Sequence, residues 1–133
     1  MIAPKFLLLL CLSLGATLSG WAAPDPIVVT AADEGRVIEL GRGREMNVAL
    51  EGNRTTGFSW SLDAVPSAAL LQLGEPIYTA TPASPRYTGA GGVETWRFRA
   101  IEAGSLRLRF VYRRPFEKEV APARMVTIQV QIR

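Results

Sequence analysis

Short runs of alternating apolar and polar residues constrain the fold of this chain more than any other feature of its sequence. The clearest alternation covers three segments toward the C-terminus, residues 95–100, 106–112 and 126–132. A period of two places the apolar side chains on one face of a β-strand, so each segment predicts a half-buried strand. Beyond the N-terminal segment, no window shows a sustained helical period.

Weaker strand signals fill the rest of the chain, between turns rich in glycine and proline. They are residues 27–30, 37–40, 46–51, 58–62, 70–73 and 77–80. Short alternating strands separated by such turns, over roughly 100 residues, are typical of a two-sheet sandwich. We therefore predict an all-β fold, an immunoglobulin-like β-sandwich with one hydrophobic core.

The N-terminus has the pattern of a secretory signal peptide. Lys5 precedes the apolar run Phe6–Leu18, which is too short for a transmembrane helix, and small residues follow it. Gly20 and Ala22 lie two positions apart, which predicts cleavage after Ala22. A retained anchor is disfavoured, because a single charge and no stop-transfer pattern accompany the run. We expect a signal peptide at residues 1–22, one domain at residues 23–133, and an exported protein, periplasmic or secreted, that is not held by a membrane.

The lack of reactive side chains excludes several classes of chemistry. The chain has no histidine, and its one cysteine, Cys11, lies inside the predicted signal peptide. Leu10 precedes that cysteine where lipid attachment would need a small residue. The mature domain would then lack a thiol and an imidazole, which excludes Ser-His-Asp and Cys-His catalysis and the commonest zinc sites. We expect a monomeric protein that is not an enzyme and needs no cofactor or metal.

A run of turn-forming residues, Gly52–Gly57, lies between two of the predicted strands. Its two glycines accommodate positive φ angles, and Asn53 can hydrogen-bond its own backbone, so a tight, defined loop is expected. The two threonines at the tip would gain nothing from burial, which indicates an exposed tip. An ordinary β-turn in a hairpin is the alternative interpretation.

Two further loops stand out in the C-terminal half. A phosphate-binding glycine loop opens a helix, whereas a predicted strand follows Gly89–Gly92, so here the backbone is expected to approach another surface closely. In the second loop Pro115 fixes φ and holds Phe116 in a set direction, which is typical of a recognition surface. The alternative is that Phe116 folds back over the edge of the sandwich.

Four arginines on two predicted strands raise the question of nucleic-acid binding. They are Arg97, Arg99, Arg107 and Arg109. No aromatic residue is interleaved on that outward face, as single-strand binders require, and Glu94 and Glu102 lie nearby to offset the charge. If the two strands belong to opposite sheets, the two arginine pairs share no surface. We therefore interpret them as solvated outer faces and expect no nucleic-acid partner.

Three motifs taken together, residues 53–60, 89–92 and 114–116, resemble in order and spacing the three motifs of the chagasin family of cysteine peptidase inhibitors. The resemblance spans the whole predicted domain and implies an immunoglobulin-like sandwich, in agreement with the strand pattern. It also implies tight, reversible, non-covalent inhibition of papain-like cysteine peptidases, which would be the partners of this protein.

The resemblance also implies a role for each loop. The first loop would enter the active-site cleft with Thr55 and Thr56 over the catalytic cysteine, the glycine-rich loop would lie along one side, and the third would pack on the other. The residues expected to bind the peptidase are Asn53, Arg54, Thr55, Thr56, Gly57, Phe58, Gly89, Ala90, Gly91, Gly92, Arg114, Pro115 and Phe116.

Two of these positions depart from the family pattern. Arg54 stands where the family usually has proline, and the change is expected either to loosen the first loop or to add a charge contact. Phe116 stands where the family often has tryptophan, so stacking on the target is expected to be weaker. The alternative function is an exported immunoglobulin-like adhesion or ligand-binding module that uses the same loops.

Overall fold

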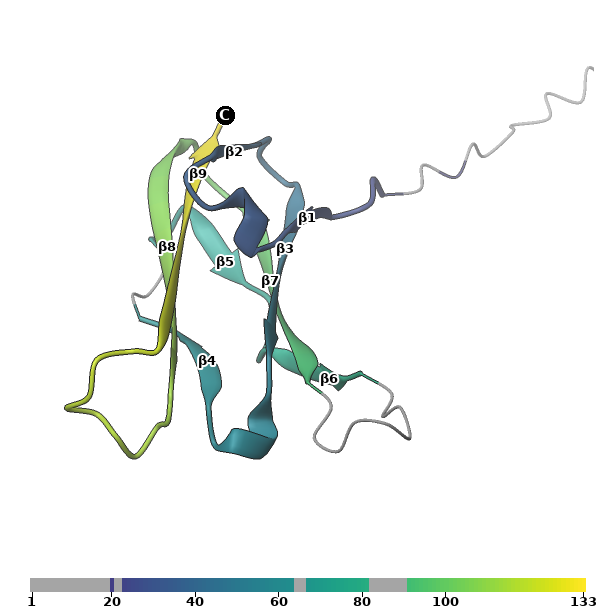
Figure 1. Ribbon diagram of the computed structural model, residues 1–133. Helices are drawn as coiled ribbons and strands as arrows, with labels where there is room; N and C mark the ends of the chain where they lie inside the picture. Colours follow the sequence, from purple (N-terminus) through teal and green to yellow (C-terminus); the bar gives the residue numbers. More distant parts are fainter. Residues whose placement is uncertain (1–19, 21–22, 64–66, 82–90) are drawn as a thin grey trace, which may run out of the picture.

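The computed structural model describes residues 20, 23–63, 67–81 and 91–133 of the chain. Within these residues two β-sheets face each other and enclose one core (Figure 1). This arrangement confirms the all-β, immunoglobulin-like sandwich. In the same part of the chain no helix has the length and apolar character needed to cross a membrane. Nearly all of the expected signal peptide lies outside the described residues, so that assignment stays a prediction.

The strands agree with the predicted segments to within a few residues. The first sheet contains, in spatial order, β1 (Ile27–Val29), β3 (Glu45–Gly52), β7 (Gly92–Ala100) and β5 (Leu70–Gln72), with β6 (Ile77–Ala80) also paired to β7. The second contains β2 (Val37–Leu40), β9 (Arg124–Ile132), β8 (Gly104–Arg113) and β4 (Ser59–Leu62). Two short 3-10 helices, η1 (Ala31–Asp33) and η2 (Arg54–Thr56), lie between strands.

The core lies between the sheets and is built from the apolar positions of the alternating strands. Its almost fully buried members include Met46, Val48, Leu50, Trp96, Phe98, Leu108, Phe110, Ile128 and Ile132. Burial of a side chain of this size contributes roughly 1.5–3 kcal/mol. Trp96 and Phe110 meet edge to face across the core with their ring centroids 5.0 Å apart. Packing of this core is thus the main link between the two sheets, as expected for a domain without a disulfide.

The segment between β3 and β4 does not close a hairpin, so that alternative is wrong. β3 pairs antiparallel with β7, whereas β4 pairs antiparallel with β8 in the other sheet. Alternation determines which face a strand buries but not which strand it pairs with. The pattern was therefore compatible with a hairpin and also with a loop between two sheets. The β3–β4 loop, Asn53–Phe58, consequently bridges the two sheets and is anchored to both.

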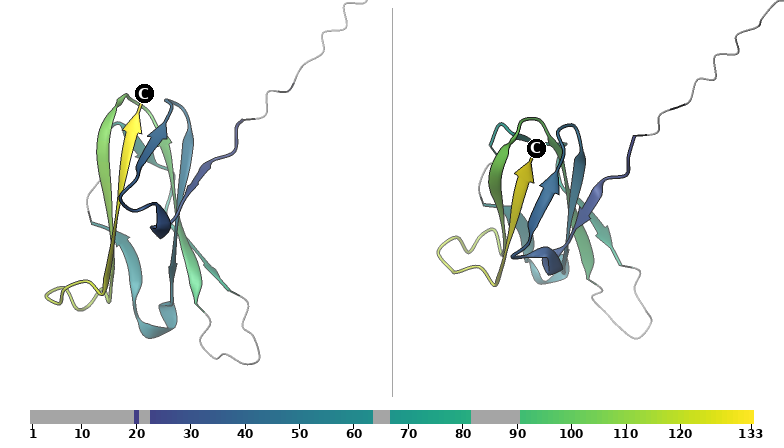
Figure 2. Two further views of the ribbon diagram at one scale, coloured as in Figure 1. Left: turned by 45° about the horizontal axis from the view of Figure 1, so that its top comes forward. Right: turned by 90° about the horizontal axis from the view of Figure 1, so that it is seen from above.

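The first two strands also divide between the sheets. β1 runs parallel to β3, and β2 runs parallel to β9. η1 makes the crossing, and Thr30 caps it: its hydroxyl accepts a hydrogen bond from the Ala32 amide (3.3 Å), while its own amide donates to Asp33 (2.9 Å). In Figure 2 this segment closes one side of the sandwich.

Two loops and the adjoining ends of β6 and β7 lie at the end of the sandwich that carries η2. In Figure 1, η2 lies at the bottom of the sandwich, with the loop between β8 and β9 to its left and the ends of β6 and β7 to its right. The C-terminus lies at the opposite end. The described parts of the three sequence motifs are therefore brought to one end of the molecule, as the strand order required.

The outward arginines lie on two different sheets, as expected, but one acidic residue expected to offset their charge does not lie beside them. Arg97 and Arg99 lie on β7 and Arg107 and Arg109 on β8, so the two pairs face away from each other on different sheets. Arg97 and Arg99 contact Glu45, at 3.9 and 2.7 Å. The expectation that Glu94 offsets this charge is wrong. Glu94 is 1% exposed, because it lies two residues before Trp96 and therefore on the same inward face of β7.

Candidate functional site

The tip of the β3–β4 loop is a closed, hydrogen-bonded turn. Asn53 caps η2: its side-chain oxygen accepts hydrogen bonds from the amide of Thr55 (3.0 Å) and from its hydroxyl (2.5 Å). The hydroxyl of Thr56 donates to the carbonyl of Asn53 (2.7 Å). Gly57 ends the turn in the left-handed region at φ 83°, where a side chain would be strained. The expected tight and exposed loop is confirmed, with both threonines at the surface.

A tyrosine of the second sheet holds the beginning of this loop. The hydroxyl of Tyr112, on β8, accepts a hydrogen bond from the amide of Asn53 (2.9 Å). The Tyr112 ring packs between Phe58 and Trp60, with centroid distances of 5.3 and 5.0 Å. The indole N–H of Trp60 in turn donates to the carbonyl of Glu51 (2.9 Å), at the end of β3. The loop is thus fixed at both ends by aromatic residues that join the sheets.

Arg114, the first residue of the β8–β9 loop (residues 114–123), turns back toward the tip. Its Nε donates to the carbonyl of Thr56 (3.2 Å), and its guanidinium lies 4.6 Å from the ring centroid of Phe58. Nη1 also contacts Glu117 at 3.3 Å. Sequence reasoning assigned Arg114 and Phe58 to the peptidase surface. The structure brings them together as a brace between the first and third loops, with part of each still accessible.

Phe116 extends away from the sandwich. Its side chain is 75% exposed, and Pro115 before it is exposed as well. The alternative in which Phe116 folds back over the sandwich edge is therefore wrong. A large aromatic side chain held in water on a proline-containing loop is a candidate anchor for a partner, because it retains apolar area to bury and has few torsions to restrict.

Of the glycine-rich motif, Gly89 and Ala90 lie outside the described residues. Gly91 is partly exposed, and its carbonyl accepts a hydrogen bond from the amide of Thr81 (2.9 Å). Gly92 is buried: a Cβ there would lie 2.5 Å from Cζ of Tyr78, so the missing side chain makes room for that ring. Gly91 thus remains available to a partner, while Gly92 supports the site from below.

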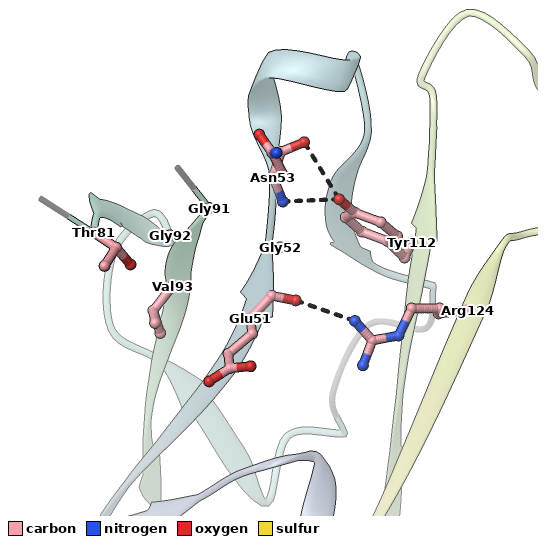
Figure 3. A pocket seen from close by; sticks show the side chains of 9 residues that line it. All are labelled: Glu51, Gly52, Asn53, Thr81, Gly91, Gly92, Val93, Tyr112 and Arg124. Carbon is pink, nitrogen blue, oxygen red and sulfur yellow. Dashed lines mark hydrogen bonds between the residues drawn. The ribbon is translucent and has the colours of Figure 1, made fainter. Parts of the chain in front are cut away.

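An open pocket flanks the tip on the glycine side (Figure 3). It is lined by Glu51, Gly52, Asn53, Thr81, Gly91, Gly92, Val93, Tyr112 and Arg124. In Figure 3 the end of β3 runs through its middle, and Arg124 reaches across to the carbonyl of Glu51, a hydrogen bond of 3.4 Å. Among the described residues, the base of the tip is thus flanked on this side by open space. A partner surface could contact the tip and the glycine backbone together.

Arg54 occupies an unexpected position. Its Nε lies 3.3 Å from Oε1 of Glu94, and its guanidinium lies 4.6 Å from the ring centroid of Tyr78. Of the two expectations for this residue, an added charge contact is found, and it is made within the molecule.

Sequence reasoning did not identify Glu94, Tyr78 or Tyr112 as part of the site. The only available signal was that Glu94 shares the inward register of Trp96.

The described residues of the site include no recognisable catalytic constellation. Within the described ranges, no three His, Cys, Asp or Glu side chains form a group that could hold a metal ion. The accessible groups at this end include two threonines, the Gly91 backbone and Phe116, which offer shape, hydrogen bonds and apolar area. This set is suited to binding another surface.

Comparison with known proteins agrees with this geometry. The family model for the chagasin family peptidase inhibitor I42 matches residues 39–131. Amoebiasin-1 of Entamoeba histolytica is 27% identical over 104 residues, covering 78% of this chain and 97% of the relative. Chagasin of Trypanosoma cruzi is 26% identical over 92 residues, covering 66% and 81%.

Solved structures share the fold over most of the chain. The crystal structure of a cysteine protease inhibitor from Entamoeba histolytica superposes with a TM-score of 0.72 at 20% identity, covering 80% of this chain and 95% of that one. The family match extends from β2 to β9 and contains all three loops. The chain belongs to the chagasin family of peptidase inhibitors.

Proposed function

We propose that this protein is a reversible, non-covalent inhibitor of papain-like cysteine peptidases and that it blocks the active-site cleft with three loops. Thr55 and Thr56 would enter the cleft, the glycine backbone ending at Gly91 would lie along one wall, and Phe116 would pack on the other. The observation that carries the proposal is a closed, exposed tip standing between an exposed phenylalanine and an accessible glycine backbone.

The closed tip supports inhibition rather than cleavage. A peptidase acts on an extended chain with a carbonyl presented to its nucleophile, whereas Arg54–Thr56 form a 3-10 turn. The hydroxyls of Thr55 and Thr56 are engaged by Asn53, so opening the turn would break both hydrogen bonds. The tip can then fill a cleft without presenting a scissile bond in a productive pose. A preorganised tip also loses little conformational entropy on binding.

The family assignment supports the same function. Peptidase inhibition is the activity that the family description names, and the structural neighbour from Entamoeba histolytica is described as a cysteine protease inhibitor. The papain-like target class and the role of each loop belong to our proposal.

The proposal is tested by titrating papain, at fixed concentration, with the purified protein. We expect residual activity to fall stoichiometrically and the protein to be recovered uncleaved. The double substitution of Thr55 and Thr56 by lysine should abolish inhibition and leave the protein folded, because both side chains are exposed. Its unfolding temperature should fall only slightly, through loss of the two hydroxyl hydrogen bonds to Asn53. Ala103→Lys, in the turn between β7 and β8 at the opposite end, is the matched control.

Two results would contradict the proposal. If the double lysine variant still inhibited, the tip would not enter the cleft. If the folded protein failed to inhibit papain and a small panel of related peptidases, the adhesion or ligand-binding module would become the better hypothesis.

Export is the second part of the proposal, and it is supported by the pattern of Lys5, the apolar run and the small residues that follow. To test export, the full chain is expressed in a bacterial host, and the intact mass of the protein in the periplasm and medium is measured. We expect a mass corresponding to residues 23–133. Recovery of the uncleaved chain from the cytoplasm or the membrane would contradict it.

A further inference from the structure

A buried carboxylate lies directly beneath the tip. Glu94 is the one buried charged residue in the described part of the chain, with 1% of its surface exposed. Removing a carboxylate from water costs several kcal/mol unless partners replace the lost hydration. A buried charge at this position therefore needs partners that the fold supplies.

The partners of Glu94 lie on both sides of the tip. Its Oε1 accepts a hydrogen bond from Nε of Arg54 (3.3 Å) and another from the amide of Trp60 (3.2 Å). Arg54 is the first residue of η2, and Trp60 is the second residue of β4. One carboxylate on β7 thus contacts the chain as it begins the turn and again as it enters the next strand.

The Arg54 side chain is itself held in place. Tyr78, the cross-strand partner of Glu94 on β6, lies beneath its guanidinium. The absence of a side chain at Gly92 leaves room for that ring. The Arg54 side chain remains 48% exposed and covers a carboxylate that is almost fully buried. Oε2 of Glu94 has no hydrogen-bond partner among the described residues, so the ion pair with Arg54 is the main compensation for its charge.

We propose that Arg54 and Glu94 are positioning residues that form a charged latch beneath the tip, setting the angle at which Thr55 and Thr56 project. This inference rests on the proposed inhibitory function. It also revises the role of Arg54, which acts within the inhibitor and contacts the peptidase little or not at all. Neither residue needs to touch the target for inhibition to depend on both.

The test compares Arg54→Met, Glu94→Leu and the double variant in three assays: thermal unfolding, hydrogen exchange of the amides of residues 55–58, and inhibition of papain. In Arg54→Met the buried carboxylate loses its counterion, so both stability and inhibition should fall. The double variant removes both charges, and apolar replacement of a buried ion pair commonly restores stability. We expect its unfolding temperature to rise above that of Arg54→Met but to stay below the wild type, because leucine leaves the Trp60 amide without its acceptor. Loop exchange should stay faster and inhibition weaker than in the wild type, each by about tenfold or more.

The readouts separate the latch from other roles. A purely structural role predicts that inhibition returns together with stability in the double variant, and this result would overturn the proposal. Direct contact of Arg54 with the peptidase predicts weak inhibition by Arg54→Met but normal inhibition by Glu94→Leu, which would overturn it as well. Arg97→Met, which replaces an outward arginine of similar exposure paired with Glu45, is the matched control and should leave all three readouts close to those of the wild type.

Two provisions keep the outcome decisive. If Glu94→Leu does not fold, Glu94→Gln replaces it, because the amide oxygen can still accept from Trp60 while the charge is removed. Exchange of the loop amides requires no peptidase, so failure of the wild-type protein to inhibit would contradict the proposed function without affecting the exchange result. Wild-type exchange rates in the double variant would contradict the latch alone.

Discussion

Removing the hydroxyl of Tyr112 should loosen the tip without disturbing the packing around it. Tyr112→Phe keeps the ring that lies between Phe58 and Trp60. It removes the acceptor for the Asn53 amide, a partly buried hydrogen bond of 2.9 Å. The 3.4 Å bond from the hydroxyl to the Asn53 carbonyl is lost too, although its length makes it a small contribution.

The expected cost follows from these contacts. A neutral hydrogen bond contributes about 1 kcal/mol, and leaving its donor partly buried without this acceptor adds some of the desolvation penalty, giving a total of about 1–2 kcal/mol. For a domain of this size that corresponds to a fall in Tm of about 4–10 °C. Because Asn53 begins the turn, its amide should exchange faster and inhibition of papain should weaken.

The assay combines thermal unfolding followed by circular dichroism with hydrogen exchange of the Asn53 amide. Tyr78→Phe is the control, since the structure gives its hydroxyl no hydrogen bond within the described residues, and its Tm should stay close to that of the wild type. An unchanged Tm together with unchanged Asn53 exchange in Tyr112→Phe would refute the conclusion that this hydroxyl holds the tip.

Three further substitutions test other parts of the site. Gly57→Ala should cost roughly 1–3 kcal/mol in unfolding free energy, because φ is 83° there, and Gly57→Asn should cost less; equal stability of all three proteins would contradict the strain. Gly92→Ala should lower the free energy of unfolding by about 1–3 kcal/mol, since its Cβ would lie 2.5 Å from Tyr78. In the control Gly41→Ala the closest contact of the new Cβ is 3.5 Å, so thermal unfolding should show almost no change in stability. Phe116→Ala should leave Tm unchanged but weaken papain inhibition by about tenfold or more. Val120, which is 57% exposed on the same loop, provides the control: an equal loss of inhibition in Val120→Ala would argue against a specific anchor at Phe116.

The sequence was sufficient to predict the strands and the exposed tip because each depends on local chemistry. Alternation in β7, β8 and β9 indicates which residues face the core, and the capping by Asn53 and the turn at Gly57 use contacts only a few residues apart. Strand pairing could not be predicted in the same way. The segment between β3 and β4 has the composition of a hairpin turn, and only the packing of two sheets assigns its flanks to different partners.

The supporting residues of the site were missed for a related reason. An acidic side chain on an apolar strand is normally expected to face water, and Glu94 becomes tolerable inside only because Arg54, 40 positions away in the sequence, closes over it. Likewise, Gly92 was interpreted as a surface for a partner, yet its missing side chain accommodates Tyr78 on the neighbouring strand. Contacts of this kind depend on strand register, which a single sequence does not determine.

The closed turn of η2 also bears on how fast a complex would form and dissociate. Its hydrogen bonds are already made in the free protein, so no slow rearrangement has to precede docking. Association would then be limited by diffusion and orientation, with a rate constant of about 10⁵–10⁷ M⁻¹s⁻¹ typical of preformed surfaces. Differences among target peptidases would appear mainly in how long each complex lasts.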